Sequence, residues 1–174
     1  KGGGLYTQPH ANQASSDVRI LNTVLRRNAA SSNGGGAYAG SAVTTTFSDV
    51  DFLNNSAVGN GGAVNIGEHT TGTVHFERVL VKRNTAGGDG AGIHFYRTSG
   101  SVRDSTFTEN TAGGYGGALG QDAQDSNKKE LSIENSTFTS NEADAGGAVT
   151  FKQDTTTIHG CTFTGNTAKA GSEN

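Results

Sequence analysis

One sequence motif recurs along almost the whole chain, and it constrains the fold more than any other feature. Two clear copies read S-T-F-T-E-N-T-A-G-G-Y-G-G-A-L from Ser105 and S-T-F-T-S-N-E-A-D-A-G-G-A-V from Ser136. Each copy is anchored on an asparagine, and the anchors lie 27, 29, 26, 31 and 25 residues apart: Asn28, Asn55, Asn84, Asn110, Asn141 and Asn166. A loose period of this length is typical of solenoid coils and is foreign to a heptad.

Apolar residues occupy fixed positions relative to each anchor asparagine. The residue three positions before it is large and apolar, as in Leu25, Phe52, Val81, Phe107, Phe138 and Phe163. A smaller residue stands five positions before it, and an alanine stands two positions after it. The side chains at minus five and minus three point to one face of a strand, because they lie two residues apart. Another apolar column lies eight positions before the asparagine. Because positions minus eight and minus five are three residues apart, they break the two-residue alternation of a strand, so a bend is predicted between these two columns.

The residue six positions before each asparagine is suited to that bend. Asparagine, aspartate and glycine tolerate a left-handed backbone, and they occupy this position in every copy except the one with Arg78: Asn22, Asp49, Asp104, Asn135 and Gly160. Two further corners are expected, one at the repeated asparagine and one after the Gly-Gly-Ala-apolar strand. We therefore predict an all-β parallel β-helix of about six coils of 25–31 residues, with three short strands in each coil.

Stacking of the coils predicts what holds them together. Phe107, Phe138 and Phe163 are expected to form one interior column, with about 4.8 Å between coils. The anchor asparagines are expected to lie inside their corner and to pass amide hydrogen bonds along the stack, because a buried amide must find partners.

The pattern F-T-x-N-x-A followed by Gly-Gly-Ala-apolar resembles the repeat of chlamydial polymorphic outer-membrane proteins. Matches to the first part are Phe52–Asn55, Phe107–Asn110, Phe138–Asn141 and Phe163–Asn166. Matches to the second part are Gly61–Val64, Gly116–Leu119 and Gly146–Val149, while Leu25, Val81 and Ala91-Gly92-Ile93 depart from the pattern. The resemblance covers nearly the whole chain. It implies a right-handed β-helix that is displayed outside the cell.

Bulk properties exclude several classes of protein. A net charge of −3 with 17% charged residues excludes a nucleic-acid reader. No apolar run approaches the roughly 20 residues of a membrane-spanning helix. The single cysteine, Cys161, falls in an interior column and is interpreted as a small buried hydrophobe.

The 174 residues are predicted to form a single β-helix segment, residues 1–174, with irregular insertions near 6–17 and 120–130. Repeat sequence at both ends, Lys1–Tyr6 and Gly165–Asn174, indicates a fragment of a longer solenoid. The expected partners of the end coils are further coils of the same chain or neighbouring copies, associated end to end.

No catalytic or metal-binding constellation is recognised. Asp49 and Asp104 share a corner column, but Arg78 lies in the coil between them, so the column is interpreted as an electrostatic ladder. Glycoside hydrolysis needs two carboxylates that converge without a cation between them. The five histidines show no ligand spacing. We therefore expect no catalytic residue, no cofactor and no metal.

Threonines flank the interior phenylalanine in three successive coils: Thr106 and Thr108, Thr137 and Thr139, Thr162 and Thr164. A flat Thr-x-Thr array is the surface that β-helical ice-binding proteins present, although threonine is also simply a good residue for an exposed strand. In the earlier coils other residues stand at these positions, as at Asp51 and Leu53.

Two sequons, at Asn54 and Asn135, are possible N-glycosylation sites at exposed corners. The leading hypothesis is a non-enzymatic structural or adhesive module of an extracellular or cell-surface protein or filament. Its partners would be cell-surface glycans or proteins. The alternatives are an ice-binding surface and a β-helix that binds or degrades polysaccharide.

Overall fold

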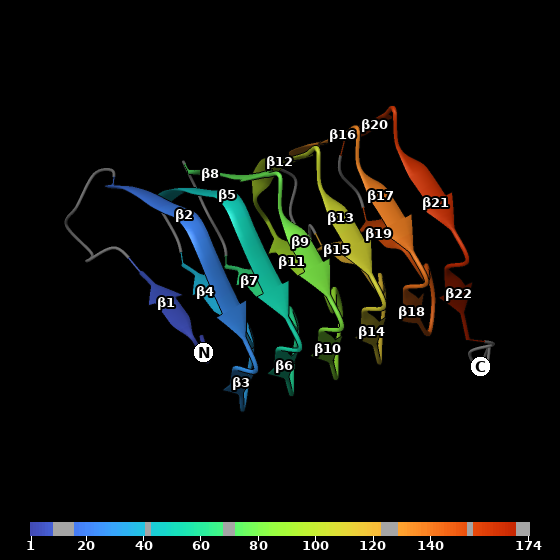
Figure 1. Cartoon of the computed structure of the whole chain (residues 1–174), viewed down its shortest axis with the longest axis horizontal. Helices are drawn as coiled ribbons and strands as arrows, with labels where there is room; N and C mark the ends of the chain where they lie inside the picture. The colour runs from blue at the N-terminus through green and yellow to red at the C-terminus, as the bar shows by residue number, and fades with distance from the viewer. Residues whose placement is uncertain (9–15, 41–42, 68–71, 123–128, 153–154, 170–174) are drawn as a thin grey trace.

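The chain folds into a parallel β-solenoid in a computed structural model that describes residues 1–8, 16–40, 43–67, 72–122, 129–152 and 155–169. These residues form strands, bends and turns, with no helix among them, and the strands pair with one another in parallel. Three sheets run along the stack (Figure 1). The predicted fold class is confirmed.

The first sheet contains the strands that follow the glycine motif. Its six strands are, in spatial order, β1 (Leu5–Thr7), β4 (Ala37–Ala39), β7 (Val64–Ile66), β11 (Ile93–Tyr96), β15 (Leu119–Asp122) and β19 (Val149–Lys152). The third sheet is made of two-residue strands that follow each anchor asparagine. They are β3 (Ala29–Ala30), β6 (Ser56–Ala57), β10 (Thr85–Ala86), β14 (Thr111–Ala112), β18 (Glu142–Ala143) and β22 (Thr167–Ala168).

The second sheet carries the two apolar columns that precede the asparagine. In the first two coils it runs without interruption through the bend, as β2 (Ser16–Arg26) and β5 (Val43–Leu53). In the later coils the bend divides it into a first half and a second half. The first halves are β8 (Thr73–Glu77), β12 (Ser99–Arg103), β16 (Glu130–Glu134) and β20 (Thr155–His159). The second halves are β9 (Leu80–Lys82), β13 (Thr106–Thr108), β17 (Thr137–Thr139) and β21 (Thr162–Thr164).

The bend six residues before each asparagine lies where the sequence predicts it. The backbone is left-handed at all six positions, including the arginine, with φ of 48°, 57°, 51°, 49°, 48° and 64°: Asn22, Asp49, Arg78, Asp104, Asn135 and Gly160. Arg78 therefore adopts the same conformation as its neighbours, because the stacking of six equivalent coils outweighs the local cost of a left-handed arginine.

The corner after the first-sheet strand lies where the sequence predicts it, as at Arg97 between β11 and β12, with φ of 52°. The second corner is shifted by one position from the prediction. The left-handed residue of the second corner precedes the anchor asparagine by one position, at Arg27, Asn54, Arg83, Glu109, Ser140 and Gly165. This shift leaves the asparagine itself free to turn its amide inward. A further bend lies before the first-sheet strand, at the first glycine of the motif, as in Gly61 and Gly116, both with φ of 68°.

The second glycine of the motif is required by close approach between coils. A Cβ atom at Gly62 would lie 2.4 Å from the carbonyl oxygen of Thr85, and one at Gly117 would lie 2.2 Å from that of Gly147. Real Cβ atoms are not found so near a backbone oxygen, so a side chain here would push the coils apart.

The interior of the stack contains the two apolar columns and the first-sheet strands. Phe107 and Phe138 are fully buried, with ring centroids 4.9 Å apart, and Phe138 lies 4.8 Å from Phe163. Phe163 and Ile158 were expected inside, but each is 43% exposed. In the part of the chain that the structure describes, β20 and β21 are the last strands of the second sheet, so no later strand covers them. For the same reason Cys161 is only partly buried against the core.

The anchor asparagines form a continuous hydrogen-bonded column. In each step the backbone N–H and the side-chain Nδ2 of one asparagine donate to Oδ1 of the next, as from Asn84 to Asn110, with both distances 3.0 Å. Nδ2 also donates to a backbone carbonyl of the preceding coil, as from Asn110 to Val81 at 2.9 Å. The same pattern joins all six: Asn28, Asn55, Asn84, Asn110, Asn141 and Asn166.

The predicted insertions fall largely outside the residues that the structure describes. Residues 9–15 and 123–128 are not among the described residues. Gly120–Asp122 and Glu130, by contrast, are strand residues of β15 and β16. A search of the described residues finds no helix with the length and apolar character needed to cross a membrane.

Candidate functional site

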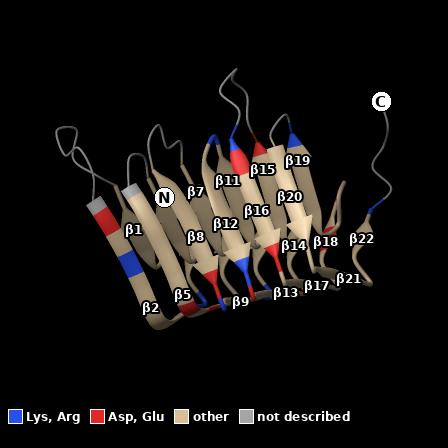
Figure 2. Cartoon of the chain, turned by 90° about the horizontal axis from the view of Figure 1, so that it is seen from above, with Lys and Arg blue, Asp and Glu red and all other residues tan. Residues whose placement is uncertain are grey.

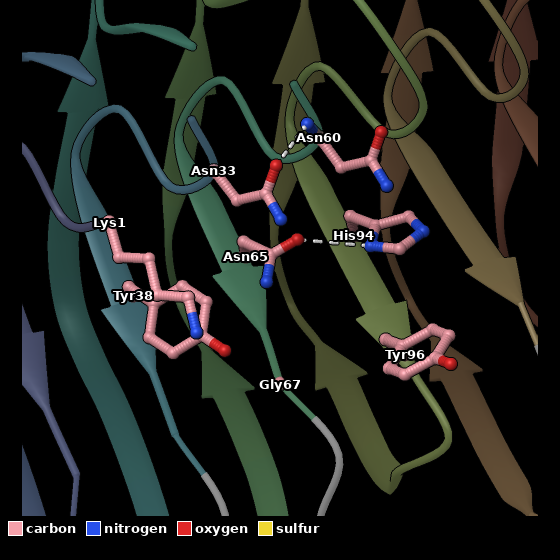
Figure 3. Close-up of a pocket in the computed structure, with 8 residues that line it drawn as sticks. All are labelled: Lys1, Asn33, Tyr38, Asn60, Asn65, Gly67, His94 and Tyr96. Carbon is pink, nitrogen blue, oxygen red and sulfur yellow. Dashed lines mark hydrogen bonds between the residues drawn. The ribbon is translucent and has the colours of Figure 1, made fainter. Parts of the chain in front are cut away.

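The most enclosed polar site that we identify lies on the outer surface of the first sheet. It is a pocket of about 360 Å³ on the first coils (Figure 3), and its lining is polar and aromatic: Lys1, Asn33, Tyr38, Asn60, Asn65, Gly67, His94 and Tyr96. This volume is near the lower end of the range of small-molecule sites, about 300–1,000 Å³.

Strand register brings the floor of the pocket together. The first residue of each of these strands, Ala37, Val64 or Ile93, is buried in the core, so the next residue points outward. These outward residues are paired across three strands, with Tyr38 opposite Asn65 and Asn65 opposite His94. Gly67 follows Asn65 by two residues, just after β7, and Tyr96 follows His94 by two residues, at the end of β11.

A second asparagine column forms the wall above this floor. Asn33 Oδ1 accepts a hydrogen bond from the backbone N–H of Asn60 at 3.0 Å, and Asn60 Oδ1 accepts one from the N–H of Asp89 at 2.9 Å. Asp89 continues the column, since its Oδ1 accepts from the N–H of Tyr115 at 2.8 Å. Each residue thus binds the turn of the next coil.

The sequence analysis missed this column and the pocket it encloses. A signal was present, because the three residues each stand five positions after an anchor asparagine: Asn33, Asn60 and Asp89. The outward residues Asn65 and His94 gave no such signal, since nothing in the repeat distinguishes them from ordinary surface positions.

His94 is buried although it lies on the outer surface of the sheet. It is 2% exposed, Asn65 beside it is 3% exposed, and His94 Nδ1 lies 3.1 Å from Asn65 Oδ1. Burial lowers the pKa of His94 to about 4, and the nearby carboxylates of Asp89 and Asp122 offset this only in part. The imidazole is therefore neutral at neutral pH, with Nδ1–H donating to the amide oxygen.

The low pKa of His94 predicts that the protein loses stability in mild acid. Between pH 6.5 and about 4 the unfolded chain binds a proton at this residue and the folded chain does not. The contribution to the free energy of unfolding is complete above pH 6.5 and falls by up to about 3 kcal/mol as the pH drops to 4. Chemical denaturation at several pH values should show a smaller acid loss for His94→Gln. If the free energy of unfolding of His94→Gln depended on pH as in the unchanged protein, His94 would not be the source of the acid loss.

The predicted ladder of Asp49, Arg78 and Asp104 forms only in its first step, between Asp49 and Arg78. Arg78 donates to both carboxylate oxygens of Asp49, at 2.8 and 2.9 Å, and also contacts Glu77. These hydrogen bonds lower the pKa of Asp49 to about 2. Within the described ranges, however, no ion pair joins Arg78 to Asp104. Arg78 adopts the same left-handed bend as the aspartates, and its side chain lies back along the stack toward Asp49.

Charges also alternate along the outer face of the first halves of the second sheet. Glu77, Arg103 and Glu134 are paired in register, and Figure 2 shows the alternating acidic and basic strand ends. Arg103 lies 3.3 Å from Glu134. No group of three or more His, Cys, Asp or Glu residues that could hold a metal occurs in the part of the chain described.

The six threonines do form an aligned array. Thr106, Thr137 and Thr162 are paired in register, as are Thr108, Thr139 and Thr164, and all six are exposed or half-buried on the outer face of β13, β17 and β21. The next strand on one side, β9, has Leu80 and Lys82 at these positions. The array therefore ends at β9 on that side.

Both sequon asparagines are exposed at left-handed bends. Asn54 has φ of 54° and Asn135 has φ of 48°. Their side chains point away from the core, in contrast to the buried anchors such as Asn55.

Comparison with known families gives one match. Residues 49–67 and 104–120 match the model of the Chlamydia polymorphic membrane protein repeat. These two segments contain Phe52–Asn55 with Gly61–Val64, and Phe107–Asn110 with Gly116–Leu119, so the resemblance stated from the motifs is confirmed. In a coarse sense the match supports a surface or outer-membrane module. No curated protein and no solved structure matches the chain.

Proposed function

We propose that this chain, two of whose coils match the polymorphic membrane protein repeat, is a non-enzymatic structural or adhesive module of a cell-surface protein or filament. The observation that carries the proposal is the organisation of the stack. The positions that repeat from coil to coil lie inside the stack, in the asparagine and phenylalanine columns, whereas the outer faces display varied polar side chains. A rigid rod with a variable surface is suited to presenting contacts away from a membrane.

The last coil supports continuation of the stack. Phe163 and Ile158 expose apolar surface there, and among the described residues no further strand pairs with the outer edge of the last coil, which is formed by β19, β20, β21 and β22. Open parallel edges pair readily with further strands. We propose that another coil of the same repeat, from this polypeptide or from a neighbouring copy, covers this face.

Surface display is testable on intact cells that produce the protein. An antibody raised against residues 1–174 should label unpermeabilised cells, and external protease should remove the label. Labelling that appears only after permeabilisation would contradict the proposal. A cytoplasmic protein of the same cells serves as the control for membrane integrity.

Ice binding is the second candidate, favoured by the in-register threonine array. Thermal hysteresis in solutions of the chain that disappears in Thr137→Lys would favour this function over the adhesive one. The interruption of the array by Leu80 and Lys82 of β9 makes ice binding the weaker of the two candidates.

A further inference from the structure

The side-chain NH2 groups of Asn33 and Asn60 in the pocket wall are not needed by the fold. The oxygens of these two amides bind backbone N–H groups of the following coil. Because a backbone N–H can only donate, the amide oxygen must face it and the NH2 group must turn away. Figure 3 shows the amide nitrogens of both residues on the side of Asn65 and His94.

Asp89 shows that the fold requires only an oxygen at this position. Its carboxylate binds the N–H of Tyr115 just as the two asparagines bind their coils, at 2.8 Å. Aspartate has no NH2 group, yet the column continues through it. The two asparagines therefore carry hydrogen-bond donors that stacking of the coils does not use.

Asn65 adds a third such donor on the floor. Its oxygen is engaged by His94 Nδ1, which leaves its NH2 group directed along the floor toward Gly67 (Figure 3). Within the described part of the chain, none of the three NH2 groups has a hydrogen-bond partner. Unused donors in a partly buried pocket are best satisfied by a ligand that brings acceptor oxygens.

Two tyrosines flank these donors. Tyr38 and Tyr96 lie on opposite sides of the pocket, and the space for the Tyr38 hydroxyl depends on Gly67. A Cβ atom at Gly67 would lie 2.6 Å from that hydroxyl oxygen. The ammonium of Lys1 lies 5.0 Å from the centre of the Tyr38 ring. No carboxylate is among the lining residues named above, so an anionic group would meet a cation and neutral donors.

From this arrangement we propose that the pocket binds an acidic sugar of the uronate class. Its hydroxyl oxygens would accept from Asn33, Asn60 and Asn65, its carboxylate would lie toward Lys1, and a ring face would pack on a tyrosine. An acidic sugar would be the ligand of the adhesive role proposed above, and its biological relevance rests on that role. Binding by the purified chain, however, is independent of where the protein is displayed.

The test is a titration of the isotope-labelled protein with glucuronate and, separately, with glucose, followed by NMR of the side-chain amides. Saturable shifts of Asn33, Asn60 and Asn65 are expected, with glucuronate binding about tenfold more tightly than glucose because of its charge-assisted contact. The variant Asn33→Asp/Asn60→Asp keeps both structural oxygens and loses both NH2 groups. It should weaken binding of both sugars at least about tenfold while Tm changes by less than about 3 °C.

The matched control is Thr139→Asp, which adds a carboxylate on the second sheet, away from the pocket. It should bind both sugars as the unchanged protein does, which excludes an effect of the protein's net charge. Weaker binding of glucose in the double variant then reports loss of the donors, because glucose carries no charge. Absence of saturable shifts with either sugar would overturn the proposal, and so would unchanged binding in the double variant. Tighter binding of glucose than of glucuronate would overturn the acidic part of it. None of these results bears on surface labelling of cells, which tests the proposed function separately.

Discussion

Replacing Asn110 with leucine should lower the free energy of unfolding by about 3–6 kcal/mol, the largest effect expected of a polar substitution in this protein. Asn110 is fully buried in the middle of the asparagine column. Its Oδ1 accepts from the N–H and the Nδ2 of Asn84, and its Nδ2 donates to the carbonyl of Val81. Leucine has a similar size but would remove all three hydrogen bonds. The N–H of Asn84 and one of its two Nδ2 hydrogens would lose their acceptor, although Nδ2 still donates to the carbonyl of Phe52. Each buried group left unsatisfied costs about 1–3 kcal/mol.

The control is the same substitution at the first anchor, Asn28→Leu. Asn28 is only part-buried, and its side chain donates one hydrogen bond to Asn55, whose Oδ1 keeps the backbone N–H of residue 28 as a partner. The expected loss is therefore about 1 kcal/mol. Chemical denaturation of both variants measures the difference. Equal losses at the two positions would mean that the column adds nothing beyond a single hydrogen bond.

Phe138→Ala should destabilise the protein by about 3–5 kcal/mol. Phe138 is fully buried and lies parallel to the rings of Phe107 and Phe163, with interplanar angles of 10° and 7°. Removing the ring would leave a cavity between two coils, and the hydrogen-bonded strands above and below would resist closing it.

Thr139→Ala, one residue along the same strand, provides the matched comparison. Thr139 is half-buried on the outer face of β17 and should cost no more than about 0.5 kcal/mol on substitution. Both unfolding curves can be recorded under the same conditions. A loss at Thr139 as large as that at Phe138 would reverse the assignment of the two faces.

The two predictions concern parts of the molecule that could be derived from the sequence. The spacing of phenylalanine and asparagine within one coil predicts which side chains point inward. The recurrence of this spacing predicts that the side chains of successive coils stack on one another. The left-handed bends could be located in the same way, because asparagine, aspartate and glycine mark them in five coils of six. Arg78 shows that the repeat, more than the local residue, decides the backbone conformation.

The candidate pocket could not be derived in this way. Asn33, Asn60, Asn65 and His94 are separated by up to 61 residues, and they meet only because three coils stack in one register. Their residue types are ordinary for turns and exposed strands, so no motif distinguishes them. The burial of His94, which sets its low pKa, also depends on neighbours from other coils.

The sequence by itself determined the solenoid, its interior columns and the bend six residues before each asparagine, because these follow from a period that each coil repeats. The tertiary structure alone decided which outward side chains become neighbours, and hence where donors, rings and charges gather. The physical reason is that interior positions are constrained to be alike in every coil by packing and hydrogen bonding. Outward positions carry no such constraint, so their chemistry has meaning only after the coils are aligned.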